Sequence, residues 1–260
     1  MNDVEVAIAV VRDGAAVVRR RFGTALARTD KGGGDFATDA DIEAEKAMLE
    51  TLRRERPGDA VVGEELGPSG TDGRERTWLI DPLCGTLNFA ARMRVVAVNA
   101  ALVSPTGTAV AAVAEPFADR VFWTDGRSAA AREGSEEAPL EPSASSRLVD
   151  LNLDPPFPNA SWFRAVTLAA DDEFTARFRP RVVSSSLALT WVASGQRTAY
   201  ITDGDVRGSV HFAAGLAICE AAGCRISDLH GERWDSGAGG LIVAADDATH
   251  GALVRLVGRL

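Results

Sequence analysis

The residues best suited to chemistry lie in one short stretch, TWLIDPLCGTLNF, at residues 77–89. Its apolar start predicts a strand that ends at Asp81, and α/β proteins tend to place ligands at the carboxyl ends of strands. Pro82 and Gly85 then predict a turn. The amides of Gly85 and Thr86 would open a short helix, whose unpaired N–H groups can receive a phosphate. A generic Asp-Pro turn explains the first acid and the proline, but not the glycine, threonine and asparagine that follow.

Further acidic residues precede this stretch. Thr38 and Asp41 have the Thr-x-x-Asp spacing of a helix capping box, which is one interpretation of the pair. Glu64 and Glu65 follow an apolar run that predicts a strand at residues 60–63. Phosphate-ester hydrolysis by divalent metals needs clustered carboxylates for hard cations, amides for the phosphate and a group that orients the attacking water. This chemistry sets the roles that candidate residues have to fill.

Three blocks of the sequence resemble the inositol monophosphatase family. The central block, residues 81–89, matches the family's Asp-Pro-(Ile/Leu)-Asp-Gly-Thr-x-Asn-Phe motif except at its second aspartate. Residues 31–65 contain an Asp-x-x-Thr-x-x-Asp pattern followed by Gly-Glu-Glu, and residues 211–223 are similar to the family's Asp-x-Ala-Ala-Gly helix start. The resemblance covers most of the chain. It implies an α+β / α/β fold, the layered α-β-α-β-α sandwich of this family, and a homodimer.

The resemblance implies a set of metal ligands and a water-activating pair. Glu64 and Asp81 would bind a divalent metal ion, Mg²⁺ in this family, with the Leu83 carbonyl as a further oxygen donor. Asp41 would pair with the Thr86 hydroxyl to orient and activate the nucleophilic water. This role competes with the capping interpretation of Asp41.

The resemblance also implies how a phosphorylated substrate would be held. The Gly85 and Thr86 amides would bind the phosphate. Lys31 is a further candidate, because it lies in a glycine-rich loop and is one of two lysines among 28 basic residues. In the family the leaving group is selected by the C-terminal half, where the match at residues 184–186 and 203–205 is poor. An inositol substrate is therefore not supported, and a sugar phosphate, a nucleotide or another small polar metabolite stays open.

The two departures from the family pattern fall on one metal site. Cys84 and His211 stand where the family has aspartates, and both aspartates are ligands of the second metal ion there. Random decay would more often strike unrelated positions. Here two hard oxygen ligands become a thiol and an imidazole, so the pair requires an explanation of its own.

Several interpretations of this pair compete. The Glu64, Asp81 and Leu83 site could still hold Mg²⁺ in a one-metal phosphatase, with Cys84 and His211 only filling space. Alternatively, Asp81, Cys84 and His211 bind Zn²⁺ or Fe²⁺, which thiolate and imidazole ligands favour over Mg²⁺. A third hypothesis is a Cys84/His211 nucleophile and base dyad with Asp81 as the orienting acid, since a nearby helix N-terminus lowers a thiol pKa. In the fourth, both are inert and the chain is a ligand-binding pseudophosphatase.

The hydrophobic pattern predicts the elements that position these residues. A 3.6-residue apolar period indicates a helix over residues 8–22, and a second helix should run from Thr38 to Arg56. Strands are expected at residues 60–63, 77–80, 95–103 and 108–113, with an edge strand at 121–124. A polar surface excursion at residues 126–146 leads to a more regular β/α alternation: strands at 148–151, 181–183, 198–202 and 241–244, and helices at 162–169, 188–194, 211–222 and 249–257. We therefore expect halves at residues 1–125, carrying the metal and phosphate motif, and 126–260, completing the site.

Composition limits the function further. The net charge of −9 disfavours nucleic acid as a partner, because binding to a phosphate backbone needs clustered cations. No apolar run approaches the ~20 residues that span a bilayer, and the acidic N-terminal residues do not resemble a secretory signal, so we expect no membrane association and a cytoplasmic location. Three cysteines in 260 residues argue against a disulfide framework. The expected function is hydrolysis of a phosphate monoester of a small anionic metabolite by a site with altered metal ligands.

Overall fold

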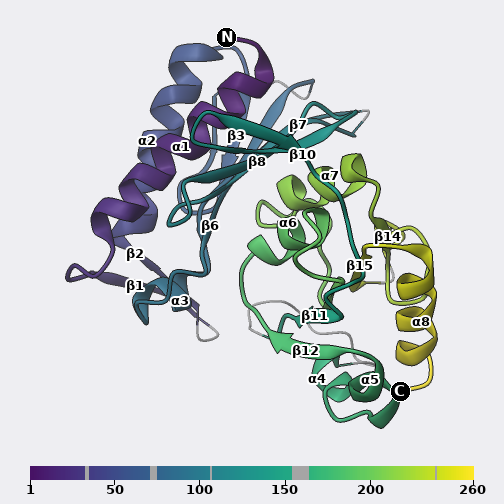
Figure 1. Cartoon of the computed structure of the whole chain (residues 1–260). Helices are drawn as coiled ribbons and strands as arrows, with labels where there is room; N and C mark the ends of the chain where they lie inside the picture. The colour runs from purple at the N-terminus through teal and green to yellow at the C-terminus, as the bar shows by residue number, and fades with distance from the viewer. Residues whose placement is uncertain (33–34, 71–74, 106, 154–163, 238) are drawn as a thin grey trace. The chain divides into compact units, whose positions relative to one another are not determined.

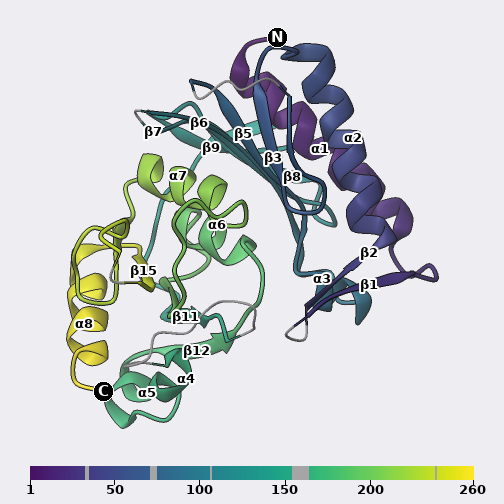
Figure 2. The same ribbon diagram turned by 180° about the vertical axis from the view of Figure 1, so that it is seen from behind.

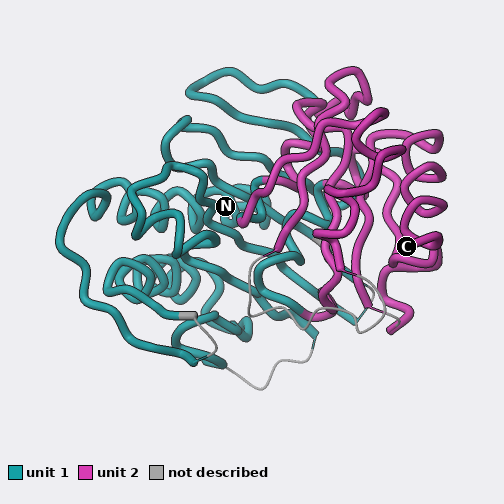
Figure 3. Tube along the Cα trace, turned by 90° about the horizontal axis from the view of Figure 1, so that it is seen from below, with its two compact units in different colours: residues 1–139, 185–187, 209–218 teal, residues 140–184, 188–208, 219–260 magenta. Residues whose placement is uncertain are grey.

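The computed structural model describes residues 1–32, 35–70, 75–105, 107–153, 164–237 and 239–260. The chain divides into two compact units (Figure 3). Unit 1 comprises residues 1–139, 185–187 and 209–218, and unit 2 comprises residues 140–184, 188–208 and 219–260. Two short segments from the C-terminal half of the sequence thus belong to unit 1. The boundary at residues 125/126 stays a prediction.

Unit 1 is built on an eight-stranded sheet with the strand order β10-β9-β8-β7-β6-β5-β3-β4. Neighbouring strands are antiparallel except β3 and β5, which are parallel. The bounds are β3 Ala60–Gly63, β4 Gly67–Ser69, β5 Thr77–Cys84, β6 Ala97–Ser104, β7 Gly107–Glu115, β8 Arg120–Thr124, β9 Ala129–Glu133 and β10 Glu136–Pro139. The predicted 77–80 strand is therefore longer than expected and contains the acid of the motif.

Two long helices cover one face of this sheet. Helices α1 (Asp3–Arg21) and α2 (Asp39–Glu55) lie side by side along it in Figures 1 and 2. Each begins at a capping residue whose side chain accepts a backbone N–H, Asn2 for α1 and Thr38 for α2. Their apolar stripes and the inner face of β5–β8 form one buried core, which includes Trp78. The sequence predicted both helices, although α1 begins at Asp3, before the predicted start at residue 8.

The structure corrects two sequence predictions in unit 1. The segment after α1 was expected to be a glycine-rich loop, but β1 (Arg28–Gly32) and β2 (Asp35–Thr38) pair there as an antiparallel ribbon; Gly33 and Gly34 lie outside the described residues. Strand β8 was expected at a sheet edge, and the polar segment after it as a surface excursion. Instead β9 and β10 form a hairpin that continues the sheet. All four β10 residues are exposed, so their composition resembles that of a loop.

Unit 2 contains a five-stranded mixed sheet, ordered β12-β11-β13-β15-β14. Its strands are β11 Leu148–Leu151, β12 Arg179–Val182, β13 Ala199–Thr202, β14 Arg225–Ser227 and β15 Leu241–Ala244, and its helices include α4 Ala165–Leu168, α5 Asp172–Arg177 and α8 Asp247–Val257. Helices α6 (Leu187–Ala193) and α7 (Ala213–Ala222) contribute residues to both units. The predicted strands are present, whereas α5 and β14 were not predicted. The predicted helix at 162–169 falls partly outside the described residues.

Mixed sheets with packed helices give the layered α/β class that the sequence predicts. Among the described residues, no helix combines the length and the apolar character needed to cross a membrane.

Candidate functional site

A bulge in β5 brings the acid and the thiol of the central motif to the same place. Asp81 pairs with Asn99 of β6, and Cys84 pairs with Ala97. The two pairs are three residues apart along β5 but only two residues apart along β6, so β5 contains one extra residue. Residues three apart in a regular strand point to opposite faces, but the extra residue of a bulge restores a common side. Pro82 lies inside this bulge, where its missing N–H costs no ladder hydrogen bond.

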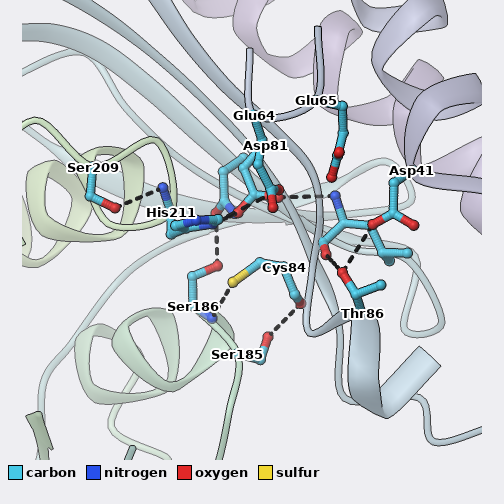
Figure 4. Close-up of polar contacts among 12 residues, drawn as sticks. Asp41, Glu64, Glu65, Asp81, Cys84, Thr86, Ser185, Ser186, Ser209 and His211 are labelled. Atoms are coloured by element: carbon cyan, nitrogen blue, oxygen red, sulfur yellow. Dashed lines mark hydrogen bonds and ion pairs between the residues drawn. The ribbon is translucent and has the colours of Figure 1, made fainter. Parts of the chain in front are cut away.

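Asp81 is the fully buried centre of the site. Its Oδ1 accepts a hydrogen bond from the Leu83 amide at 3.0 Å, and its Oδ2 accepts one from Asn99 Nδ2 at 3.3 Å. The same Oδ2 lies 2.7 Å from Nδ1 of His211, a residue 130 positions later in the sequence. Figure 4 shows the two side chains pointing toward one another. Both belong to unit 1, so this contact lies inside one compact unit.

Cys84 and His211 form what we call the thiol–imidazole side of the site. Asp81, Cys84 and His211 each offer one ligand atom, and these three atoms all lie within 4.8 Å of one another. The Cys84 Sγ accepts a hydrogen bond from the Ser186 amide at 3.2 Å, and the Ser185 hydroxyl donates to the Cys84 carbonyl at 3.2 Å. The structure therefore brings together the three residues that the sequence singled out as a triad or a metal site.

The electrostatics of this side differ from the sequence expectation. A helix N-terminus was expected to lower the pKa of Cys84, but burial and the charge of Asp81 raise it above its ordinary value. Burial alone would lower the pKa of His211, yet the Asp81 carboxylate raises it well above the ordinary range. Helix α3 (Thr86–Ala90) is only one short turn, with Gly85 in the left-handed conformation at its start. Its dipole is too small to outweigh the desolvation of the thiol.

The opposite part of the site, Asp41, Glu64, the Leu83 carbonyl and Thr86, offers only oxygen atoms, and we call it the oxygen side. The Thr86 Oγ1 lies 2.9 Å from Asp41 Oδ1 and 3.1 Å from the Leu83 carbonyl. Asp41 Oδ2 accepts hydrogen bonds from both the amide and the hydroxyl of Thr38, and the amide bond completes the capping box of α2. The capping and the pairing interpretations of Asp41 are thus both satisfied, one by each carboxylate oxygen. Burial raises the pKa of Asp41 to about 6.

Glu64 provides the test of whether a metal ion fits. Its Oε1 accepts from Lys31 Nζ at 2.9 Å, whereas its Oε2 is buried and, among the described residues, accepts no hydrogen bond. Burial and the nearby charge of Asp81 raise the pKa of Glu64. A buried carboxylate oxygen without a donor beside a second carboxylate needs a proton or a cation. Glu64 and Asp81 therefore suit the divalent ion that the motif implies.

Lys31 and Glu65 are further charged residues of the site. The Lys31 Nζ lies 2.6 Å from Glu65 Oε1, so its ammonium links Glu64 and Glu65. Burial alone would lower the pKa of Lys31, but the two carboxylates raise it. Glu65 is an ion-pair partner of Lys31. The predicted phosphate-binding roles of Lys31, Gly85 and Thr86 stay predictions.

The structure adds Glu45 of α2, which sequence reasoning missed. This fully buried carboxylate accepts the amides of Glu65 at 2.8 Å and Leu66 at 2.9 Å. It packs directly over Gly63, where an added Cβ would lie 1.9 Å from its Oε1. Asp41 and Glu45 are four residues apart and thus on one face of the helix, a spacing that could have indicated a shared role.

Asn99 was also not predicted as a site residue, and Ser186 was named only within residues 184–186, the region that selects the leaving group in the family. Ser186 Oγ donates to Asn99 Oδ1 at 2.9 Å, which fixes the amide that donates to Asp81. Asn99 belongs to no motif of the sequence, so only the pairing of β5 with β6 could have indicated it.

Comparisons with known proteins identify the family. A sequence model described as the inositol monophosphatase family matches residues 2–260. The chain belongs to this family. It is 32% identical to the inositol-1-monophosphatase of Caulobacter vibrioides, over 94% of this chain and 96% of that protein. It is also 32% identical to the Nus factor SuhB of Salmonella typhimurium, over 87% and 85% of the two chains.

Solved structures agree on the fold. The inositol monophosphatase structure of Thermotoga maritima superposes with a TM-score of 0.83 at 20% identity, covering 100% of this chain and 98% of that one. This likeness confirms the predicted layered sandwich of the family. Family members act on small phosphorylated substrates and are generally Mg²⁺-dependent phosphatases.

Proposed function

We propose that this chain is a metal-dependent phosphatase that hydrolyses a phosphate monoester of a small metabolite, a sugar phosphate or a nucleotide. The observation that supports it most directly is the Thr86–Asp41 hydrogen bond of 2.9 Å beside the buried carboxylates Glu64 and Asp81. It pairs a hydroxyl with a proton acceptor next to a cation site. A proton acceptor within reach of a metal-activated water assists hydrolysis.

Charge explains why the substrate needs a metal ion. Asp81, Glu64, Glu65 and Asp41 bring four carboxylates together, opposed by the ammonium of Lys31 and the imidazole of His211. A phosphate would be repelled by this surplus of negative charge. A divalent ion held by Glu64, Asp81 and the Leu83 carbonyl would reverse the local charge and polarise the phosphoryl oxygens and the water.

The residues of the chain supply the remaining steps. Thr86 donates its hydroxyl proton to Asp41, so its oxygen is free to accept a hydrogen bond from the attacking water. As the water oxygen bonds to phosphorus, it passes a proton to Thr86 Oγ1 while Thr86 passes its own to Asp41; the bond from phosphorus to the ester oxygen breaks, and that oxygen takes a proton from solvent water. The Gly85 and Thr86 amides and the third N–H of Lys31 would hold the phosphate oxygens.

Phosphate release from a panel of sugar phosphates and nucleotides tests this function. We expect turnover that requires a divalent ion and that falls sharply in Glu64→Gln. Glu173→Gln is a matched control, since Glu173 pairs with Arg255 and Arg259 and lies in unit 2, outside the segments considered for the site. Equal phosphate release by the native chain and Glu64→Gln would overturn the proposal.

The contact among Asp81, His211 and Cys84 favours a second candidate function, covalent catalysis by a Cys84/His211 dyad. The order carboxylate, imidazole, thiol is the one that such a triad requires. The raised thiol pKa opposes it, because the thiolate is the nucleophile. Iodoacetamide near neutral pH separates the two functions: the dyad requires rapid alkylation of Cys84 with loss of activity, and the phosphatase proposal expects slow alkylation.

Three more expectations accompany the proposal. A homodimer would appear in analytical ultracentrifugation as twice the mass of 27.4 kDa. The acidic charge supports the absence of a nucleic-acid partner, and a cytoplasmic location stays a prediction. A pseudophosphatase would bind a phosphorylated ligand without turnover, so any Asp81-dependent phosphate release excludes it.

A further inference from the structure

We propose that Asp81, Cys84 and His211 form a binding site for a transition-metal ion of the Zn²⁺ class, which replaces Mg²⁺ on the thiol–imidazole side. The inference rests on the proposed function, because the ion would serve the same hydrolytic site. It also makes a claim about metal chemistry that can be tested without turnover.

The geometry is close to that of a formed site. Bonds from Zn²⁺ to sulfur are ~2.3 Å and those to nitrogen or oxygen ~2.0–2.2 Å, which places tetrahedral ligand atoms roughly 3–4 Å apart. The ligand atoms of Asp81, Cys84 and His211 already lie within 4.8 Å of one another. The bulge of β5 fixes two of them, and the turn before α7 fixes the third, where the His211 amide donates to Ser209 Oγ at 3.2 Å. Small side-chain rotations are enough to surround an ion.

A fourth oxygen is available at the same place. Glu64 Oε2 lies 4.0 Å from His211 Nδ1 and is the buried oxygen that accepts no hydrogen bond among the described residues. It could complete a tetrahedral set or leave that position for a water or a phosphate oxygen. Three protein ligands and one open coordination position are typical of catalytic zinc sites.

The surroundings suit a metal-bound thiolate and a metal-bound imidazole. The Ser186 amide donates to Cys84 Sγ at 3.2 Å, a contact that stabilises negative charge on sulfur. Asp81 lies 2.7 Å from one ring nitrogen of His211 and is itself oriented by Asn99. Asp81 and His211 thus lie close enough to share one ion, and the Asn99 amide that holds the carboxylate is a contact of the kind that orients a metal ligand.

The donor set decides which ion binds. Mg²⁺ requires hard oxygen ligands in near-octahedral geometry, so a thiol and an imidazole are poor ligands for it. Thiolate and imidazole favour Zn²⁺, Fe²⁺ and Co²⁺. Two aspartates replaced by these two side chains at one place change the selectivity of the site without removing its ability to hold a cation.

Cobalt titration tests the proposal directly. Co²⁺ bound to a thiolate gives a charge-transfer absorption band in the near ultraviolet, which Co²⁺ on oxygen and nitrogen ligands alone lacks. We expect the band in the full native chain and competition for it by Zn²⁺ but not by Mg²⁺. Cys84→Ser should abolish the band, and His211→Ala should weaken Co²⁺ binding at least ~100-fold, because even residues around the ligands contribute 10–100-fold.

Cys224→Ser is the matched control, since Cys224 is a buried free cysteine of unit 2. Circular dichroism of each variant establishes that it is folded. Absence of the band in the native chain, or its persistence in Cys84→Ser, would overturn the inference. If Cys84→Ser does not fold, the zinc content of the native chain after dialysis tests the inference instead. A content below one ion per two chains would then overturn it.

The two proposals fail in different ways. A cobalt band without phosphate release from any substrate leaves the metal site standing and removes the phosphatase. Phosphate release with Mg²⁺ and no cobalt band retains the phosphatase and removes the transition-metal site.

Discussion

The oxygen side and the thiol–imidazole side share Asp81 but differ in how they are built. Asp41, Glu64 and Thr86 come from the first 90 residues, and the cap of α2 fixes Asp41 by a local contact. His211 and Ser186, whose amide donates to Cys84, come from segments far along the chain that belong to unit 1. The difference suggests that the pair for water activation and the choice of metal ion are separable, because each depends on different segments.

Removing the shared residue should have the largest effect. Asp81→Asn takes away a charge that both sides use, and we expect phosphate release to fall by ~10³-fold, as loss of a group that positions the catalytic charge does. Cobalt binding should weaken in the same variant. The measurement is kcat/KM together with a Co²⁺ titration. Asp119→Asn is the control, since the Asp119 side chain is 81% exposed. Loss of one property without the other would mean that the sides do not share Asp81.

Thr86→Ala should affect the oxygen side alone. It removes the hydroxyl that pairs with Asp41, and we expect kcat to fall by ~10²-fold while cobalt binding stays unchanged. Thr51→Ala is a matched control, because Thr51 of α2 donates to Asp13 of α1 in a similar Thr–Asp pair. Steady-state kinetics of both variants provide the test. Equal kcat in the native chain and Thr86→Ala would exclude this role.

Gly63→Ala should disturb the contact between Glu45 and the backbone that follows Glu64. The new Cβ would meet Glu45, which would lose the amides of Glu65 and Leu66. We expect the free energy of unfolding to fall by ~2 kcal/mol, from buried groups left unsatisfied. Gly58→Ala is the control, because nothing lies within 4 Å of its added Cβ. Urea unfolding of both variants measures the difference, and equal midpoints would contradict the role of Glu45.

The pH dependence should be the mildest effect. Asp41 has a pKa raised to about 6 by burial, and it has to be ionised to accept a proton. Activity should therefore be constant above the pKa and fall ~10-fold for each pH unit below it. The acidic limb of kcat/KM should disappear in Asp41→Asn, whose remaining activity should be low. An acidic limb that is unchanged in this variant would assign the titration to another group.

Local patterns predicted one side of the site better than the other. The capping box at Thr38, the strand before Glu64 and the strand that leads to Asp81 depend on nearby residues, so the sequence indicated them correctly. Contact between Cys84 and His211 depends on tertiary packing across nearly half of the chain, and the sequence suggested it only through the family motif.

One wrong prediction and one missed residue also have physical reasons. The hairpin of β9 and β10 was predicted as a loop because its outer strand is exposed and polar, including Pro139 at the sheet edge. Glu45 was missed because a charged residue on a helix is usually assigned to solvent. Its burial follows from two backbone amides that no sequence pattern reveals.

The metal-ion profile of phosphate release tests the central claim most directly. The native chain and a Cys84→Asp/His211→Asp double variant are compared with Mg²⁺, Mn²⁺ and Zn²⁺ on the same substrate. We predict that the native chain works best with Zn²⁺, and that the double variant, which restores oxygen ligands, works best with Mg²⁺. The same preference for Mg²⁺ in both proteins would contradict the account, because the thiol–imidazole side would then have no part in choosing the metal.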